Sequence, residues 1–452
     1  MRRALAIAAL LLLVGCADTP DRPREQLQRA RVAVASNPAG LPLITNTITW
    51  LGAPNGLSHL SPDVGAYTSN ALATLHPGWV RGTFDYRPTN LTNYDSFNWS
   101  RVQPAGSNSF DWSGADAEVR DLTNRFPAGT KVIVVVNQGA YITNNCPNSP
   151  CSLENDPPWT AALTMQQYAQ AKARYINALA ARYTNSAWAR ANLARNVIWG
   201  IEVENETHPP YDRLALILSH AQPARATCKL IGWTCWGPLA KNWMAFVNAA
   251  PTNLYDAVSW HLYTHQVQPP DRDVGSDINQ TGYGRNDPSF VGRLDQWESW
   301  LQSQLPAGMP ILVDELGLQP EVPMRMAKAL IMLRATGAAM CQLFNWQSGN
   351  PPGEDQAYNA LPNRAYPHAR VAAWTAYWLG NATRTSSTVD GNAFVYTFSN
   401  GRSFAWSREG TTRACAVSNH ARVTDIYGNT LATCTNLTAD PVVLTGGTIT
   451  FH

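Results

Sequence analysis

The sequence predicts an α/β fold, a (β/α)8 TIM barrel followed by a small C-terminal antiparallel β-sandwich. Three observations lead to this prediction: eight short apolar runs, helical patterns between several of them, and a change of texture near residue 382. A doubly wound sheet is the alternative, but no glycine-rich phosphate loop follows the first run. With 452 residues, of which 45% are hydrophobic and 15% charged, the chain can bury a large core.

The eight apolar runs are the predicted strands of the barrel. They are residues 47–52, 79–84, 131–137, 197–206, 229–233, 257–263, 310–315 and 339–346. The clearest helices between them are predicted over Gln166–Tyr183 and Pro323–Thr336, where apolar residues recur every three or four positions. Strands alternating with helices are typical of a barrel of parallel strands.

Beyond residue 382, alternating runs separated by glycine and asparagine turns predict the strands of the sandwich. They are residues 394–398, 403–407, 422–428, 441–444 and 448–451. We expect the sandwich to pack on the barrel rather than to act as a binding module. The predicted organisation is a signal peptide (1–15), a tether with a possible sandwich strand at 31–35 (16–40), the catalytic barrel (41–381) and the sandwich (382–452).

The amino terminus has the pattern of a bacterial export signal. Two arginines precede the apolar run Ala4–Val14, which is too short to span a bilayer. Leu-Val-Gly-Cys at 13–16 resembles the lipobox of bacterial lipoproteins, which implies cleavage before Cys16 and lipid attachment to it. Ala17 in the next position favours the outer membrane under Gram-negative sorting. We therefore expect an exported protein with a lipid anchor in the membrane; ordinary secretion is the alternative.

Charge and composition narrow the class of partner. The chain carries 34 Lys and Arg against 32 Asp and Glu, and the excess of two equals Arg2 and Arg3 of the signal peptide. Because the remaining chain is neutral, it has no electrostatic footprint for a phosphate backbone, which argues against nucleic acid. Its 17 tryptophans suit stacking on sugar rings as well as core packing. We expect a monomer.

The cysteines are typical of an exported protein rather than of a redox or zinc site. Six of them form sequence neighbours that predict three short disulfides. The predicted pairs are Cys146 with Cys151, Cys228 with Cys235, and Cys415 with Cys434. Cys341 lies in an apolar run and is predicted to be a buried free thiol.

Two carboxylates end predicted barrel strands, where the reactive groups of this fold lie. Glu206 ends the fourth run and Glu315 ends the seventh. Retaining glycosidases need such a pair, one protonated acid and one ionised nucleophile, with pKa values set apart by their surroundings. Glu202, Glu204 and Glu206 share one strand face by period two, so Glu204 is an alternative acid. Glu202 is expected to pair with an arginine such as Arg81.

Both carboxylates lie in motifs of a known clan. Residues 199–206, Trp-Gly-Ile-Glu-Val-Glu-Asn-Glu, resemble the Trp-x-Phe-Glu-Val-Trp-Asn-Glu strand of clan A glycoside hydrolases, particularly family 39. Residues 313–317, Val-Asp-Glu-Leu-Gly, are similar to the strand that carries the clan's nucleophile. The resemblance implies that Glu206 is the general acid/base, that Glu315 is the nucleophile, and that Asn205 binds the sugar 2-hydroxyl.

Further site residues follow from the same resemblance. Trp-His-Leu-Tyr at 260–263 is similar to the sixth strand, which implies that His261 and Tyr263 hold the nucleophile and the sugar in subsite −1. Trp346 matches the tryptophan that floors this subsite, and Arg81 matches an arginine that steers the nucleophile. From its place at the end of the third run, Asn137 either binds sugar hydroxyls or is a solvated loop amide.

Three positions depart from the clan's pattern. Thr207 replaces the usual proline after Asn-Glu, Glu204 replaces an aromatic residue, and Asp314 replaces the small or hydroxyl residue before the nucleophile. These changes bear on substrate identity more than on the chemistry.

The predicted function is therefore a retaining glycoside hydrolase that cleaves a poly- or oligosaccharide by double displacement. It needs no metal or cofactor. Two alternatives remain: a non-catalytic polysaccharide-binding lipoprotein on the same scaffold, and a transglycosylase that uses the same residues with a sugar acceptor.

Overall fold

The computed structural model describes most of the chain from residue 79 onward. The described ranges are 79–81, 97–106, 109–125, 128–136, 156–207, 211–235, 240–264, 270–272, 292–318, 322–343, 358–359, 364–365, 367–380, 382–418, 421–431 and 434–452. The expected signal peptide, Cys16 and the strands expected at 31–35 and 47–52 lie outside them. Within these ranges, no helix combines the length and the apolar character needed to cross a membrane.

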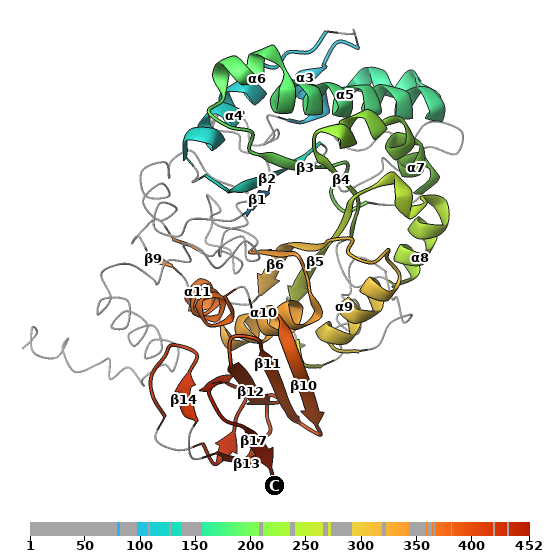
Figure 1. The fold of residues 1–452 in the computed structure, drawn as a ribbon. Coiled ribbons are helices and arrows are strands. Elements are labelled where there is room, and N and C mark those ends of the chain that lie inside the picture. Colours follow the sequence, from blue (N-terminus) through green and yellow to red (C-terminus); the bar gives the residue numbers. More distant parts are fainter. Residues whose placement is uncertain are drawn as a thin grey trace, which may run out of the picture.

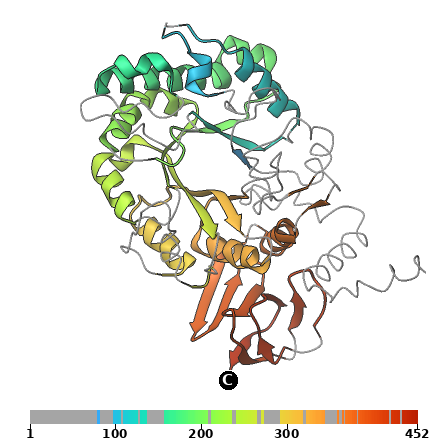
Figure 2. The same cartoon turned by 180° about the vertical axis from the view of Figure 1, so that it is seen from behind.

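Seven predicted barrel strands form one parallel sheet, in the order in which they occur in the chain. The strands are β1 (Trp79–Arg81), β2 (Lys131–Val135), β3 (Ile198–Glu202), β4 (Lys229–Cys235), β5 (Ala257–Thr264), β6 (Ile311–Leu318) and β7 (Met340–Leu343). The sheet curls so that its edge strands, β1 and β7, approach each other, with helices on the outer side (Figures 1 and 2). The predicted barrel architecture is therefore confirmed for these strands.

Helices between the strands cover the outer side of the sheet. Those described are α3 (Trp99–Val102), α4 (Ser113–Arg125), α5 (Met165–Asn185), α6 (Ala187–Asn192), α7 (Tyr211–His220), α8 (Ala240–Ala249), α9 (Leu294–Ser303), α10 (Met324–Thr336) and α11 (Pro367–Leu379). Helix α5 begins at a capping box, because Thr164 and Gln167 each accept from the other's backbone N–H. Helix α10 ends at Gly337, whose φ of 96° suits glycine. Both were predicted within two residues.

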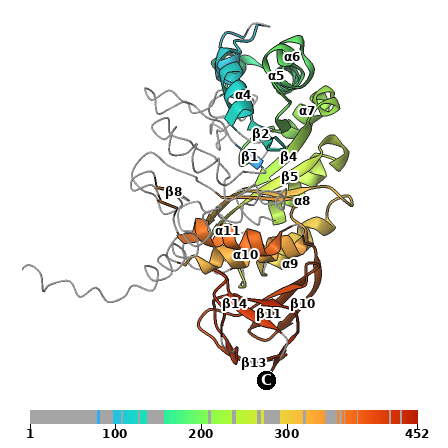
Figure 3. The same cartoon turned by 60° about the vertical axis from the view of Figure 1, so that its left-hand side comes forward.

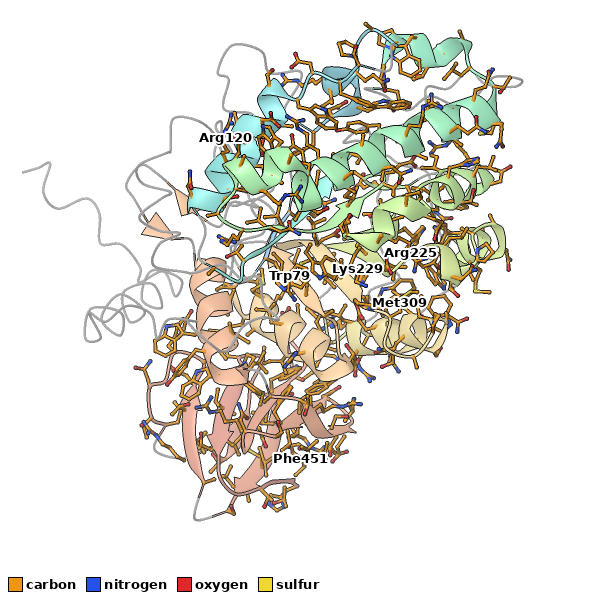
Figure 4. The ribbon with its side chains drawn as sticks, turned by 45° about the horizontal axis from the view of Figure 1, so that its top comes forward. Trp79, Arg120, Arg225, Lys229, Met309 and Phe451 are labelled. Carbon is orange, nitrogen blue, oxygen red and sulfur yellow. The ribbon has the colours of Figure 1, made fainter. Side chains whose placement is uncertain are left out.

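The inside of the barrel has an apolar floor. Side chains from six strands form one cluster there, separate from the larger core between the sheet and the helices. Its members are Trp79, Ile133, Ile231, Ala257, Leu312 and Met340. In the view with side chains, Trp79 lies amid the strands (Figure 4). This floor fills the N-terminal half of the barrel, so polar side chains further along the strands face the C-terminal mouth.

The C-terminal region forms an antiparallel sandwich. Its five-stranded sheet has the order β10-β11-β12-β16-β14 and its three-stranded sheet the order β15-β13-β17. The strands are β10 (Arg384–Asp390), β11 (Ala393–Phe398), β12 (Arg402–Ser407), β13 (Arg413–Val417), β14 (Arg422–Asp425), β15 (Asn436–Leu437), β16 (Val442–Thr445) and β17 (Ile449–Phe451). A two-stranded ladder, β8 (Tyr358–Asn359) with β9 (Arg364–Ala365), precedes α11. All five predicted sandwich strands are present.

Buried polar contacts fix the sandwich to the barrel. Helices α10 and α11 lie between the parallel sheet and the sandwich (Figures 1 and 3). Asp271 accepts from Lys328 of α10 at 3.1 Å and from the indole of Trp406 in β12 at 2.9 Å. Arg325 of α10 donates twice to Glu409, at 2.9 and 3.0 Å. The sandwich therefore packs on the barrel as expected.

The predicted disulfide between Cys228 and Cys235 is wrong. Cys228 immediately precedes β4 and Cys235 ends it. Seven extended residues span about 23 Å, far beyond the ~7 Å between Cα atoms that a disulfide allows. The thiol of Cys228 donates instead to the carbonyl of Ala224 at 3.4 Å.

The other cysteines fall into three cases. Cys341 is a buried free thiol, as predicted, and burial raises its pKa well above the usual value. The sulfur atoms of Cys415 and Cys434 lie 3.7 Å apart without a bond, so their pairing stays a prediction for the oxidised protein. Cys146 and Cys151 lie outside the described residues.

Glu298 gives the fold a testable pH dependence. Its carboxyl on α9 is 1% exposed and accepts from the indole of Trp260 at 2.6 Å. Burial raises the pKa of Glu298 to about 8, because the bond from Trp260 lowers it by less. Since this pKa lies above that of the unfolded chain, stability should fall by up to roughly 5 kcal/mol between about pH 4.5 and pH 8.

Glu298→Gln should abolish this decline, because glutamine keeps a carbonyl acceptor for Trp260 and does not ionise. Urea unfolding at pH 5 and pH 8 measures it. An equal decline in the variant would mean that Glu298 is not its source.

Candidate active site

A layer of polar side chains lies above the apolar floor of the barrel. Arg81 lies two residues after Trp79 in β1, and Asp314 lies two residues after Leu312 in β6. Because alternate residues of a strand face the same side, the spacing places both polar side chains inside the barrel. Arg81 and Asp314 are each 2% exposed. Charged groups buried to this degree need partners.

Arg81 connects three elements of this layer. Its Nε and Nη2 each donate to the carboxylate of Glu202, the last residue of β3, at 2.6 Å. Its Nη2 also donates to Oδ1 of Asn205 at 2.7 Å, and its Nε lies 3.1 Å from Oδ2 of Asp314. The predicted pairing of Glu202 with Arg81 is confirmed. Glu202 is therefore a charge partner deep in the barrel rather than a reacting group.

His261 connects this layer to the predicted acid/base. Its ring is fully buried in β5, with Nδ1 3.2 Å from Oε1 of Glu206 and Nε2 3.4 Å from Oδ1 of Asp314. In the backbone, His261 is the register partner of Glu315 in β6. One residue thus touches one predicted catalytic carboxylate and pairs with the position of the other.

Glu206 lies in a strained loop rather than on a strand. Strand β3 ends at Glu202, four residues earlier than predicted. Glu206 has a φ of 45°, and among the described residues it is the only one other than glycine with positive φ. This conformation costs on the order of 1 kcal/mol and is found preferentially at functional sites. Its side chain is 25% exposed, so the carboxyl can reach a ligand.

Thr207 ties this loop back to the sheet. Its backbone N–H donates to the carbonyl of Thr234 in β4 at 2.7 Å, and its hydroxyl accepts from Thr234 at 3.4 Å. Proline has no N–H to donate, so Thr207 makes a contact that the clan's usual residue cannot make.

Glu204 is not the acid, and the predicted common face of Glu202, Glu204 and Glu206 is wrong. The carboxylate of Glu204 accepts two bonds from Arg213 of α7, at 2.5 and 2.6 Å, and one from Lys172 of α5, at 3.1 Å. Burial alone would raise the pKa of Glu204, but Arg213 and Lys172 outweigh it and lower the pKa. Because the strand ends at Glu202, period two no longer applies beyond it.

A β-bulge lies where β6 reaches the site. Trp260 pairs with Val313, but the next residue, His261, pairs with Glu315, so Asp314 is the extra residue. Bulges often re-aim side chains beside active sites. Asp314 is thereby held between β1 and β5.

The remaining predicted residues are only partly described. The backbones of Glu315 and Tyr263 belong to β6 and β5, but their side chains lie outside the described part of the chain. Trp346 and Asn137 lie wholly outside it. The roles predicted for these four residues stay predictions, as does the contact of Arg81 with the nucleophile. Among the described side chains, no group of three or more His, Cys, Asp or Glu could hold a metal ion.

Sequence reasoning missed the cations that pair with Glu204. Lys172 lies in the stripe of α5 that also contains the buried residues Tyr168, Ile176 and Leu179. A lysine inside an apolar stripe was the available signal, because such a residue is buried only with a partner.

Solved structures of glycoside hydrolases are similar in fold to this chain. A family 39 glycoside hydrolase from the gut symbiont Bacteroides cellulosilyticus WH2 matches with a TM-score of 0.58 and 16% identity, over 88% of this chain and 82% of that one. The chain therefore shares the overall fold of this family 39 glycoside hydrolase. A family 30 subfamily 8 xylanase from Clostridium acetobutylicum has a TM-score of 0.49 and 16% identity, over 90% and 97% of the two chains. No family model and no curated protein sequence matches.

Proposed function

We propose that the protein is a retaining glycoside hydrolase in which Glu206 is the general acid/base and Glu315 the nucleophile. One observation supports this most: His261 contacts Glu206 at 3.2 Å while its backbone pairs with Glu315. Both carboxylate positions thus converge on one residue in the C-terminal half of β5. The likeness in fold to a family 39 glycoside hydrolase supports the same reaction.

The reaction has two displacements. Glu315 attacks the anomeric carbon while Glu206 gives its proton to the leaving oxygen, which forms a covalent glycosyl-enzyme. Glu206 then removes a proton from water, and the water releases the sugar from Glu315. This mechanism requires the two carboxyl groups to lie about 5–5.5 Å apart.

The surroundings of Glu206 suit this role. Its loop is strained and its carboxyl partly exposed, so it can meet the leaving group of a bound sugar. The neighbouring Asn205 has its amide oxygen occupied by Arg81. The NH2 group of Asn205 is then the end that donates to the sugar 2-hydroxyl, a bond that strengthens in the transition state.

The proposed substrate is a poly- or oligosaccharide outside the cytoplasm. The neutral charge of the chain beyond its export signal agrees with a neutral polymer better than with a strongly anionic one. We include in the proposal the export of the chain and its anchoring in the outer membrane through lipid on Cys16. The transglycosylase uses the same residues and differs only in the acceptor.

Trapping with a panel of 2-deoxy-2-fluoroglycosides tests the proposal, since these reagents stop the reaction at the covalent intermediate. Peptide mass mapping should find the sugar on Glu315, and Glu315→Gln protein should take up none. An adduct on Asp314 would keep the reaction but move the nucleophile by one residue. If no reagent labels protein that still binds polysaccharide, the binding lipoprotein becomes the better hypothesis.

A further inference from the structure

Asp314 holds a buried charge next to the proposed catalytic pair. It is the extra residue of the bulge in β6 and replaces the small or hydroxyl residue of the clan's motif. Its two carboxylate oxygens face different partners. Oδ2 lies 3.1 Å from Nε of Arg81, and Oδ1 lies 3.4 Å from Nε2 of His261.

His261 therefore has a carboxyl group at each ring nitrogen. Glu206, from the loop after β3, faces Nδ1, and Asp314, from β6, faces Nε2. Among the described side chains, Arg81 of β1 and, behind it, Glu202 of β3 are further charged groups near the ring, and the thiol of Cys341 in β7 lies close enough to Asp314 to be affected by its charge. Glu315 of β6 lies beside His261 in register. A neutral imidazole carries one proton, and its neighbours decide which nitrogen holds it.

The two carboxyl groups are not equivalent. Asp314 is buried with Oδ2 against the guanidinium of Arg81, which it shares with Glu202, and an ionised carboxylate acts as a hydrogen-bond acceptor only. Glu206 is 25% exposed and must carry a proton before it can act as an acid. Full burial of the ring of His261 disfavours a second proton on it. The single ring proton then belongs on Nε2, the nitrogen that faces Asp314.

We propose that Asp314 is a positioning residue that fixes His261 as the Nε2–H tautomer, so that Nδ1 accepts a hydrogen bond from protonated Glu206. The part of this inference that concerns catalysis rests on the proposed function; the tautomer does not. In the opposite tautomer Nδ1–H would donate to Glu206 and favour its ionised form, which is not an acid. A small or hydroxyl residue at position 314 has no charge with which to select this tautomer.

Asp314→Asn should reverse the tautomer. The amide has the shape of the carboxylate, and its oxygen should turn towards the cation of Arg81, so its NH2 group faces Nε2 of His261. Nε2 must then accept, which moves the ring proton to Nδ1, next to Glu206. Glu202→Gln is the matched control, because it removes the same charge from the other side of Arg81.

Nitrogen-15 NMR of protein labelled at its nine histidines tests this directly, with the signals of His261 identified by their loss in His261→Gln. We expect Nε2–H in the unmodified protein and in Glu202→Gln, and Nδ1–H in Asp314→Asn. A doubly protonated ring at pH 7, or Nδ1–H in the unmodified protein, overturns the proposal. This experiment needs no turnover, so it stands even if the protein proves not to be a glycosidase.

The pH dependence of kcat/KM tests the catalytic part. In Asp314→Asn, the limb that falls at high pH should move about one unit lower, a tenfold loss on that limb, with KM at the optimum unchanged. The limb should stay in place in Glu202→Gln. An unmoved limb in Asp314→Asn, or an equal movement in both variants, overturns the assigned role.

Discussion

Glu206→Gln is expected to lower kcat by about 10²–10⁴-fold on natural glycosides, which have poor leaving groups, while the fold stays intact. Glutamine has no proton to give to the leaving oxygen and cannot activate water for the second displacement. Glutamine retains a carbonyl oxygen and an NH2 group, so it can still form a hydrogen bond with Nδ1 of His261, which lies 3.2 Å from the Glu206 carboxyl in the unmodified protein. Activity should therefore be lost without a comparable loss of stability.

The leaving group makes this prediction specific. The dinitrophenolate of a dinitrophenyl glycoside departs without protonation, so the first displacement should be nearly as fast in Glu206→Gln as in the unmodified enzyme. Hydrolysis of the covalent intermediate should then stall, because the second displacement needs a general base. Azide needs no general base, so adding it should restore turnover and yield a glycosyl azide. A burst of dinitrophenolate in stopped flow, followed by rescue with azide, identifies Glu206 as the acid/base.

Glu298→Gln is the matched control for activity. It makes the same chemical change at a buried glutamate that packs outside the barrel against Trp260, so kcat at its optimum should not change. An equal loss on natural and dinitrophenyl glycosides in Glu206→Gln would contradict the assigned role, because proton transfer would not be the affected step.

The barrel could be predicted because its strands are encoded locally. Residues 131–135, Lys-Val-Ile-Val-Val, are almost wholly apolar, as a parallel strand buried on both faces requires. In contrast, β10 was missed because its sequence, Arg-Thr-Ser-Ser-Thr-Val-Asp, is exposed at all seven positions and shows no alternation. Its place in the sheet comes from pairing with β11, which a local pattern does not contain.

The site was predictable where a motif defined it and less so where the chain departs from the motif. Asn205, Glu206 and His261 were identified from their motifs, and the structure brings them together with Arg81. The early end of β3 and the bulge at Asp314 depend on hydrogen bonding to neighbouring strands, which no single segment encodes. The same reason explains the error over Cys228 and Cys235, whose closeness in sequence becomes distance along an extended strand.

Arg213→Met should lower the free energy of unfolding by about 3–5 kcal/mol, because it removes one partner of a buried ion pair. The side chains of Arg213, Glu204 and Lys172 are at most 1% exposed, so water cannot replace the lost cation. Methionine keeps most of the volume of arginine, which makes the loss electrostatic rather than a cavity effect. Since Glu204 lies two residues before Glu206, the loop that carries Glu206 should also become less rigid.

The sign of the pH dependence of the free energy of unfolding distinguishes the loss of a charge partner from a packing defect. In the unmodified protein the pKa of Glu204 is lowered, so its stabilising effect is present at neutral pH and is lost as the pH falls through the folded-state pKa. Without Arg213, burial is opposed by Lys172 alone, so the pKa of Glu204 should rise from its lowered value. The stability lost in Arg213→Met should then grow as the pH rises, and it should be larger at pH 7 than at pH 5.

Urea unfolding at both pH values measures these effects, with Arg413→Met as the control. Arg413 pairs with Asp390 at 3.0 Å, but the two side chains are 33% and 49% exposed, so its loss should cost no more than about 1 kcal/mol. The double variant Arg213→Met with Glu204→Leu should recover part of the loss, because the carboxylate is removed together with its cation and Lys172 still has Asp156 at 3.7 Å. If Arg213→Met lowers the free energy of unfolding no more than Arg413→Met does, the cluster around Glu204 does not hold the loop of Glu206 in place. The strain at Glu206 must then be balanced by its contact with His261 and by the hydrogen bonds between Thr207 and Thr234.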